Sequence, residues 1–250
     1  MFPSTCPCDP AAKAWIERRL HWLADEFDDH AFNGRRLVLP TADFFPDRYD
    51  GSPETVASLW ERVCGYMDVE PDRVTLELIS EAGKLWLVNG AGQYLPSAAG
   101  TYEQDDDACT IRLDKGDLDH PMALVATMAH ELAHARLLGE YRASQDEYDN
   151  ELLTDLTVVF FGLGLFLANT PRNWDCDYHK WPGTDWNRPE YMTPPMFGYA
   201  LAHLAWFRGE RHPRWMRHLH SNARPDFKQA VRFLFETGDS TFRPKRTARA

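Results

Sequence analysis

The chain has 250 residues, of which 44% are hydrophobic and 26% are charged, and this composition excludes a disordered or fibrous protein. Its length is sufficient for one large domain or two small ones. The formal net charge of −11 argues against nucleic acid as the main partner, because phosphate binding needs a basic surface.

The cysteines and the apolar segments indicate in which cellular compartment the protein is expected. The number of cysteines, five, is odd, and their spacing shows no disulfide framework. Cys6-Pro-Cys8 is a weak hint of metal or redox chemistry, but two free thiols are the favoured interpretation. No basic start followed by an apolar run indicates a signal peptide. The apolar run 156–168 is shorter than the roughly 20 residues of a membrane span. We therefore expect a cytoplasmic protein without a membrane partner.

Two helices are predicted before the first strands. Residues 11–31 have apolar side chains near helical spacing, which indicates an amphipathic helix. Ser52 and Pro53 are typical of a helix cap and a first helical position, so a second helix is expected from there to about Met67.

The periodicity then changes to that of strands. Residues 73–80, 84–90, 98–104 and 108–114 are rich in β-branched and aromatic residues and are separated by Gly, Asn and Asp. The acidic triplet 105–107 is expected to form the solvated turn of a hairpin between the last two, in preference to a calcium site.

Helices dominate the remainder of the chain. A long helix is expected over about 122–138, stopped by Gly139, and another from Asp146 or Asn150 into the apolar run. Residues 170–196 form an aromatic loop in this interpretation. Two or three further helices are predicted, at about 195–208, 212–221 and 225–237.

The order of helices, then a small sheet, then helices predicts an α+β fold. Within it we expect three regions. They are an N-terminal helical region over 1–70, a metal-binding core over 71–168, and an aromatic loop with C-terminal helices over 169–250, the last packed with the core.

Residues 130–134 read His-Glu-Leu-Ala-His within the predicted helix 122–138. His130 and His134 are four residues apart, so they project from one face and can bind one tetrahedral zinc. Glu131 lies beside them, where a carboxylate can deprotonate a water molecule. The alternative is that both histidines are ordinary helix-face residues.

A catalytic zinc site needs a third protein ligand and an open fourth position. Glu151 follows His134 by seventeen residues, and Asp155 lies one turn after Glu151 on the same helix face. Glu151 can be the third ligand, and Asp155 can accept a hydrogen bond from a ligand imidazole and fix its tautomer. A metal would also offset the cost of burying two carboxylates at the start of an apolar helix.

The pattern His-Glu-Leu-Ala-His followed by Asn-Glu-Leu-Leu-Thr-Asp resembles the gluzincin metallopeptidases, the thermolysin-like zincins. The resemblance covers about residues 108–165 and implies a zincin-like core with a bound Zn²⁺. It implies ligand roles for His130, His134 and Glu151, the role of base for Glu131, and an orienting role for Asp155.

The resemblance also implies an edge strand along the cleft. A small mixed sheet would place this strand beside the active-site helix, and we expect an extended peptide to add to the strand 108–114 through main-chain hydrogen bonds. The short gap between His134 and Glu151 implies a compact connection. The aromatic loop, with Trp174, Trp181 and Trp186, is a weaker candidate for a wall of the cleft.

Gluzincins also supply a Tyr or His that stabilises the oxyanion, and here several residues are candidates. Tyr199 and His203 are four apart on a predicted helix and are the first choices; Tyr191 and His179 are alternatives. The competing interpretation is that Tyr199 packs in the core with a bonded hydroxyl and that His203 is a satisfied core histidine.

The sequence thus predicts a zinc metallopeptidase that acts on a peptide or protein substrate. The alternative is a zincin-like regulatory or partner-binding protein with narrow or no proteolytic activity. A structural zinc protein is disfavoured, because such sites usually complete their ligands with Cys and carry no poised carboxylate like Glu131. The sequence does not indicate the substrate or the oligomeric state.

Overall fold

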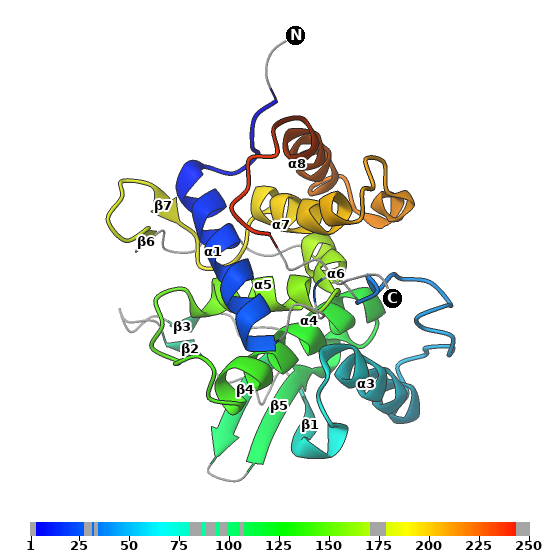
Figure 1. Ribbon diagram of the computed structural model, residues 1–250. Helices are drawn as coiled ribbons and strands as arrows, with labels where there is room; N and C mark the ends of the chain where they lie inside the picture. Colours follow the sequence, from blue (N-terminus) through cyan, green and yellow to red (C-terminus); the bar gives the residue numbers. More distant parts are fainter. Residues whose placement is uncertain are drawn as a thin grey trace. The chain divides into compact units, whose positions relative to one another are not determined.

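The computed structural model describes residues 4–27, 32, 35–80, 87–88, 94–95, 100–105, 108–170 and 179–243 (Figure 1). The chain divides into two compact units. Unit 1 consists of Met1–Leu39 and Asp146–Ala250, and unit 2 consists of Pro40–Gln145. This division cuts across the three regions expected from the sequence, because the first helix packs with helices from the second half of the chain.

Unit 2 contains the sheet and the helix with the paired histidines. Its elements are α3 (Pro53–Met67), η1 (Pro71–Arg73), β1 (Val74–Ile79), β2 (Leu87–Val88), β3 (Tyr94–Leu95), β4 (Gly100–Asp105), β5 (Ala108–Asp114), η3 (Lys115–Asp117), α4 (Pro121–His134) and the π-helical turn η4 (Ala135–Gly139). The predicted start of α3 is confirmed, since the Thr55 amide donates to the Ser52 hydroxyl over 3.4 Å.

The three-stranded sheet has the order β1-β5-β4. β5 is parallel to β1, with Leu76 opposite Ile111, and antiparallel to β4, with Tyr102 opposite Ile111. The expected hairpin is present, but the expectation that a peptide adds to 108–114 is wrong, because β5 has a partner strand on each side. Among the described residues β1 and β4 each pair with β5 alone, so both are edge strands of this sheet.

Helix α4 lies against this sheet and against α3. Its buried residues include Leu124, Met128 and Leu132, which meet a core that also contains Ile111 and Leu113 of β5. The helix then continues as the π-helical turn η4 instead of the regular helix expected up to residue 138.

Glycine at position 139 is required where this turn ends. A Cβ there would lie 2.9 Å from the Tyr102 hydroxyl and 3.5 Å from Cys109 Sγ, so the Tyr102 side chain would have to shift to admit any larger residue. The predicted stop at Gly139 is therefore confirmed, but its reason is close packing.

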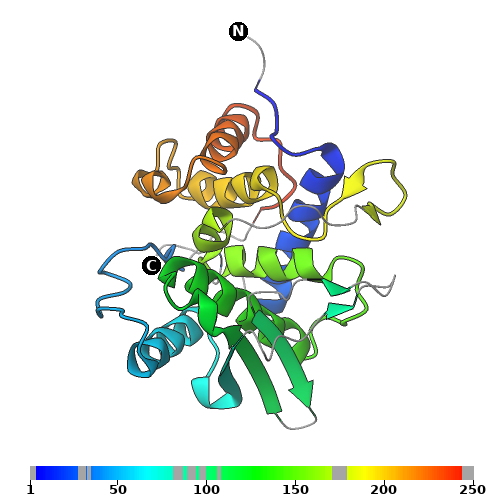
Figure 2. The same ribbon diagram turned by 180° about the vertical axis from the view of Figure 1, so that it is seen from behind.

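Unit 1 is mainly helical. Its elements are α1 (Pro10–Phe27), α5 (Asn150–Phe160), α6 (Gly164–Asn169), the short hairpin β6 (His179–Lys180) and β7 (Asn187–Arg188), α7 (Pro194–Phe207), η5 (Arg214–His218) and α8 (Arg224–Thr237). Figures 1 and 2 both show α7 and α8 side by side. Helix α7 is buried over most of its length, as expected for a helix that is apolar on all sides.

The apolar run 156–168 forms two helices, and not the single buried helix expected. α5 ends at Phe160, and Gly162 has a φ of 89°, which favours glycine. A Cβ at Gly162 would also lie 2.8 Å from the carbonyl oxygen of Arg36. Among the described residues no helix combines the length and the apolar content that crossing a membrane requires.

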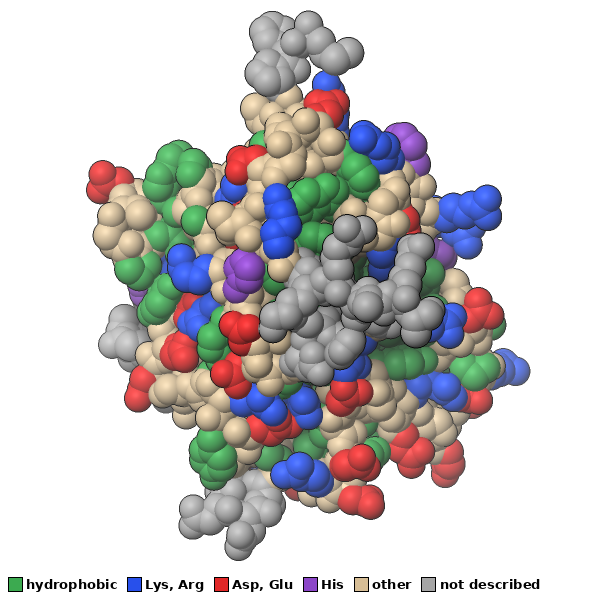
Figure 3. Space-filling model, viewed as in Figure 1, with side chains coloured by type: hydrophobic (Ala, Val, Ile, Leu, Met, Phe, Trp, Pro, Cys, Tyr) green, Lys and Arg blue, Asp and Glu red, His purple; other side chains and the backbone are tan. Residues whose placement is uncertain are grey.

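The surface mixes both signs of charge. Figure 3 shows acidic and basic side chains interspersed over the viewed face, without a broad basic area. The whole chain carries 38 acidic and 27 basic residues.

Candidate metal centre

His130 and His134 lie one turn apart on the buried face of α4. Their ring centroids are 5.0 Å apart and the ring planes are nearly perpendicular, at 87°. The two residues are 7% and 8% exposed, so both imidazoles are enclosed by protein. The spacing of four residues therefore produces the shared face that the sequence predicts.

Glu151 joins this pair from the first turn of α5. One ligand atom from each of His130, His134 and Glu151 can be chosen so that all three lie within 4.8 Å of one another. The structure thus brings together the three predicted ligands as a group that can hold a metal ion. Two imidazoles and one carboxylate with no thiolate match the donors of catalytic zinc sites, in which a fourth position stays open.

Glu131 follows His130 on the same helix and is 5% exposed. The first residue of β4 lies directly against it. A Cβ at Gly100 would be 2.9 Å from Glu131 Oε1 and 2.8 Å from Thr127 Cγ2. Only a glycine at this point of β4 therefore leaves room for the Glu131 carboxylate in its present position.

Tyr102, two residues further along β4, contacts the second histidine. Its ring stacks on His134 with the centroids 6.0 Å apart and the planes inclined by 22°. The hydroxyl lies 3.0 Å from Cys109 Sγ and donates to Gln104 Oε1 over 3.0 Å. Burial, and then Cys109, raise the pKa of Tyr102 far above its usual value, so the phenol stays neutral.

Tyr102 is a site residue that the sequence analysis missed. The available signal was the alternation of β4, which places Gly100 and Tyr102 on one face. Using it requires knowing that this face meets α4, which the local pattern does not reveal.

Asp155 is fully buried on α5. Its Oδ2 accepts a hydrogen bond of 3.0 Å from the backbone amide of Met192, just before α7. This bond fixes the carboxylate within unit 1. The predicted bond from Asp155 to a ligand imidazole stays a prediction.

Asp149, the residue before α5, anchors the start of this helix. Its carboxylate does not cap the helix; it accepts bonds from Trp15 Nε1 at 2.6 Å and from Arg19 Nε at 2.8 Å, both on α1. Arg19 Nη2 also pairs with Asp149 Oδ1 at 2.7 Å and with Glu147. Helix α1 therefore holds the chain two residues before Glu151, a role that the sequence analysis did not anticipate.

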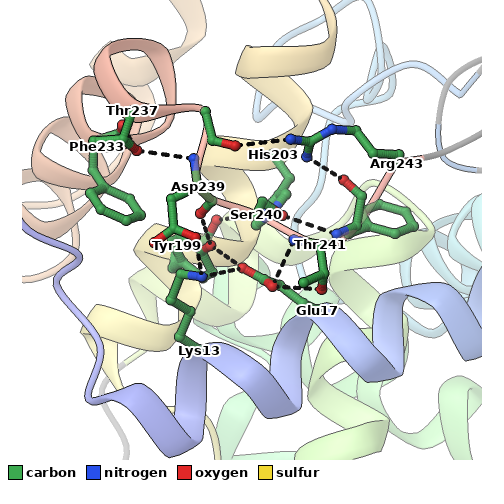
Figure 4. A network of polar contacts seen from close by, with 12 residues as sticks. Lys13, Glu17, Tyr199, His203, Phe233, Thr237, Asp239, Ser240, Thr241 and Arg243 are labelled. Carbon is green, nitrogen blue, oxygen red and sulfur yellow. Dashed lines mark hydrogen bonds and ion pairs between the residues drawn. The ribbon is translucent and has the colours of Figure 1, made fainter.

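Tyr199 and His203 belong to a second buried network in unit 1 (Figure 4). The Tyr199 hydroxyl donates to Glu17 Oε1 over 2.5 Å. His203 Nε2 lies 3.0 Å from Ser240 Oγ, and its Nδ1 lies 3.0 Å from the Tyr199 carbonyl oxygen. Both side chains are fully buried, and these bonds favour the packing interpretation.

The charges of this second network are also matched. Burial alone would raise the pKa of Glu17, but hydrogen bonds from Tyr199, Thr241 and Lys13 outweigh it and lower the value to about 2. Burial lowers the pKa of His203 to about 4, so this imidazole is neutral at pH 7. An oxyanion role for Tyr199 or His203 stays a prediction, and we leave it out of the proposed function.

The other aromatic candidates are placed only in part. His179 is exposed on β6 and Tyr191 is half-buried. Trp181 is 3% exposed and Trp186 is 50% exposed. Trp174 lies outside the described residues.

Comparison of the chain with protein-family models, with curated proteins and with solved structures gave no match. The resemblance to gluzincins therefore rests on the residues of the motif and on the geometry described above.

Proposed function

We propose that this protein is a zinc-dependent hydrolase of peptide bonds. The observation that carries the proposal is the convergence of His130, His134 and Glu151 within 4.8 Å, with Glu131 adjacent to the first of them on a buried helix face. These donors fit zinc, and the poised carboxylate distinguishes the group from a structural zinc site.

When bound, zinc supplies Lewis acidity that polarises a carbonyl group and acidifies a water molecule. Glu131 takes the proton from the attacking water and delivers it to the leaving amine. Gly100 leaves the space that this carboxylate needs, and the Tyr102 ring supports the orientation of His134. Asp149, held by α1, fixes the turn from which Glu151 reaches the group.

The substrate is proposed to be an extended peptide that adds to β4. This strand borders Glu131 at Gly100 and His134 at Tyr102, and its side away from β5 is unpaired among the described residues. Main-chain hydrogen bonds to such an edge give affinity without dependence on sequence.

Narrow specificity is favoured over general proteolysis. Glu131 is only 5% exposed, so a substrate has little room to approach the base. The alternative is a regulatory protein that cuts or binds one partner and has little or no general proteolytic activity. It differs from a general protease in that it would hydrolyse few peptides or none.

The metal content of purified protein tests the proposal. We expect about one zinc per chain in the wild type by mass spectrometry, and a sharp loss in Glu151→Ala. Glu236→Ala, which removes an exposed carboxylate from α8, is the matched control and should keep the metal.

Absence of zinc from reconstituted wild type, or its retention in Glu151→Ala, would overturn the proposal. Zinc-loaded wild type is then assayed on a mixed peptide library. Cleavage of a few sequences supports narrow specificity, and broad cleavage supports general proteolysis.

A further inference from the structure

Two buried hydrogen-bond donors in the β6–β7 hairpin have no acceptor within the part of the chain that the structure describes. They are Trp181 Nε1 and Arg188 Nε. The two residues are 3% and 8% exposed. A buried N–H group without an acceptor is costly, and more so when it belongs to a charged guanidinium.

The hairpin places these two side chains on one face. Arg188 is opposite His179 in the register, and the Trp181 amide donates to the Trp186 carbonyl over 3.0 Å. Trp181 and Arg188 are therefore diagonal neighbours on antiparallel chains, a separation that long side chains span. Both unmatched donors thus belong to one small region.

The two side chains also lie against the same part of unit 1. The Trp181 ring is 5.7 Å from the ring of Trp15. The Arg188 guanidinium is 5.6 Å from the centre of the Tyr148 ring. Both contacts lie near Asp149, since Trp15 donates to the Asp149 carboxylate and Tyr148 is the residue before Asp149 in the chain.

Asp149 does not supply the acceptor. Its two oxygens already receive three bonds, one from Trp15 and two from Arg19. The pKa of Arg188 is lowered by burial, and the attraction of Asp149, Tyr148 and Glu190 only partly offsets this. The positive charge of Arg188 is therefore incompletely compensated in this structure.

We propose that Trp181 and Arg188 form a binding site for the carboxylate of a peptide ligand. A carboxylate has two oxygens and can accept from the indole N–H and from the guanidinium at once. Because Tyr148 and Asp149 directly precede the helix turn of Glu151, the ligand is the peptide substrate; this clause rests on the proposed function. The carboxylate is either the terminus of the peptide or an Asp or Glu side chain.

Binding is tested on the full chain with three blocked dipeptides. N-acetyl-Ala-Ala carries only a terminal carboxylate, N-acetyl-Glu-Ala-amide only a side-chain carboxylate, and N-acetyl-Ala-Ala-amide neither. The protein is titrated in its metal-free form, so that a carboxylate binding to zinc does not contribute. The readout is the indole N–H resonances in a nitrogen–proton NMR spectrum, in which Trp181→Phe assigns the signal of Trp181.

We expect at least one acidic probe to shift the Trp181 resonance and the amide probe to leave it unchanged. The probe that binds identifies the source, terminal or side-chain. Arg188→Gln should weaken binding about tenfold or more, since it removes a charge-assisted bond. Trp181→Phe should weaken binding by a smaller factor, and it keeps an aromatic ring against Trp15, whose own indole N–H resonance is the readout for this variant.

Two matched variants serve as controls. Arg232→Gln removes an exposed arginine of α8, and Trp186→Phe removes an exposed indole N–H of the same hairpin; both should bind like the wild type. Three outcomes would overturn the proposal. They are equal binding of the acidic and amide probes, absence of binding by every probe, and undiminished binding by folded Arg188→Gln and Trp181→Phe.

This outcome is separable from that of the proposed function. Carboxylate binding by the metal-free protein does not require the zinc ligands, so Glu151→Ala should retain it. Zinc binding without carboxylate binding would refute this inference alone. Carboxylate binding without zinc binding would refute the proposed hydrolase and the identification of the ligand as its substrate, but would leave the carboxylate site itself standing.

Discussion

The network around Glu17 and the group around His130 are both rich in ionisable side chains, and each contains residues that are almost fully buried. In the Glu17 network each acceptor faces a donor, as Tyr199, Thr241 and Lys13 converge on one carboxylate. The His130 group brings two imidazoles and a carboxylate to one point, where ligand atoms face ligand atoms. We therefore expect the His130 group to hold a cation and the Glu17 network to have a structural role.

Replacing Glu131, the proposed base of the His130 group, should have the largest effect on turnover. Glu131→Gln keeps the size of the side chain and should lower turnover by about 10²–10⁴-fold, because general base catalysis is lost. Zinc content should not change, since the three ligands remain. The measurement is hydrolysis of a peptide cleaved by the wild type, with the metal assayed on the same samples. Full activity in the variant would remove Glu131 as the base.

Acid should weaken the fold through the Glu17 network. Below pH 6.5 the unfolded chain protonates His203, whereas the folded protein resists until about pH 4, so stability falls across this range. Glu17 contributes at lower pH. Its pKa is 4.5 in the unfolded chain and about 2 in the folded protein, so stability falls further as the pH drops from 4.5 to 2. Each of these two titrations lowers the free energy of unfolding by about 3 kcal/mol.

Urea unfolding of metal-free protein at pH 7, 5.5 and 4 measures the first of these two steps. His203→Gln should flatten the decline between pH 6.5 and 4 compared with the wild type. The same slope in both proteins would show that His203 does not titrate as a buried neutral group.

The close approach of β4 offers a second way to alter the metal group. Gly100→Ala places a methyl group against Glu131 Oε1 and Thr127, so the base must move. Turnover should fall by up to about 10²-fold, the cost of a misplacement near 1 Å. Gly65→Ala is the control, because nothing lies within 4 Å of a Cβ there and it should stabilise α3 slightly. Normal kinetics in Gly100→Ala would show that the strand gives way.

Asp155 tests how far the metal group depends on its surroundings. Asp155→Ala should weaken zinc affinity by about 10–100-fold if the carboxylate orients a ligand imidazole. Competition with a zinc chelator measures this. Because Asp155 also accepts from the Met192 amide, a loss of stability at unchanged zinc affinity would assign it a structural role.

Tyr199→Phe should have the smallest effect on the protein. It tests whether Tyr199 serves the Glu17 network or the His130 group. Loss of the hydroxyl leaves Glu17 with one donor fewer, and the expected destabilisation is about 1–2 kcal/mol. Turnover per folded molecule should be unchanged. A drop in turnover at normal stability would restore the oxyanion role that the sequence suggests.

Local signals predicted local features well. The cap at Ser52, the antiparallel pairing of β4 with β5 and the helical spacing of His130 and His134 all depend on neighbouring residues. The parallel pairing of β1 with β5 was not predicted, because it joins strands separated by the intervening β2 to β4. For this reason the edge strand was misidentified.

The residues of the candidate site that were not predicted were missed for a similar reason. Tyr102 and Asp149 acquire their roles from side chains distant in sequence, His134 and Trp15 respectively. The break at Gly162 is explained by the carbonyl of Arg36, which no local pattern contains. Helical spacing alone also grouped Tyr199 with His203 correctly, but it could not show that their partners are Glu17 and Ser240.

The discontinuity of unit 1 has a consequence for synthesis on the ribosome. Thr241 is translated 224 residues after Glu17, to whose carboxylate its hydroxyl donates a hydrogen bond. Unit 2 is contiguous and can fold as soon as it emerges, as domains generally do during translation. Until α5 and α7 follow, the apolar face of α1, with Trp15, Leu20 and Leu23, lacks the two helices against which it packs. A nascent chain paused in unit 2 therefore presents this helix to chaperones.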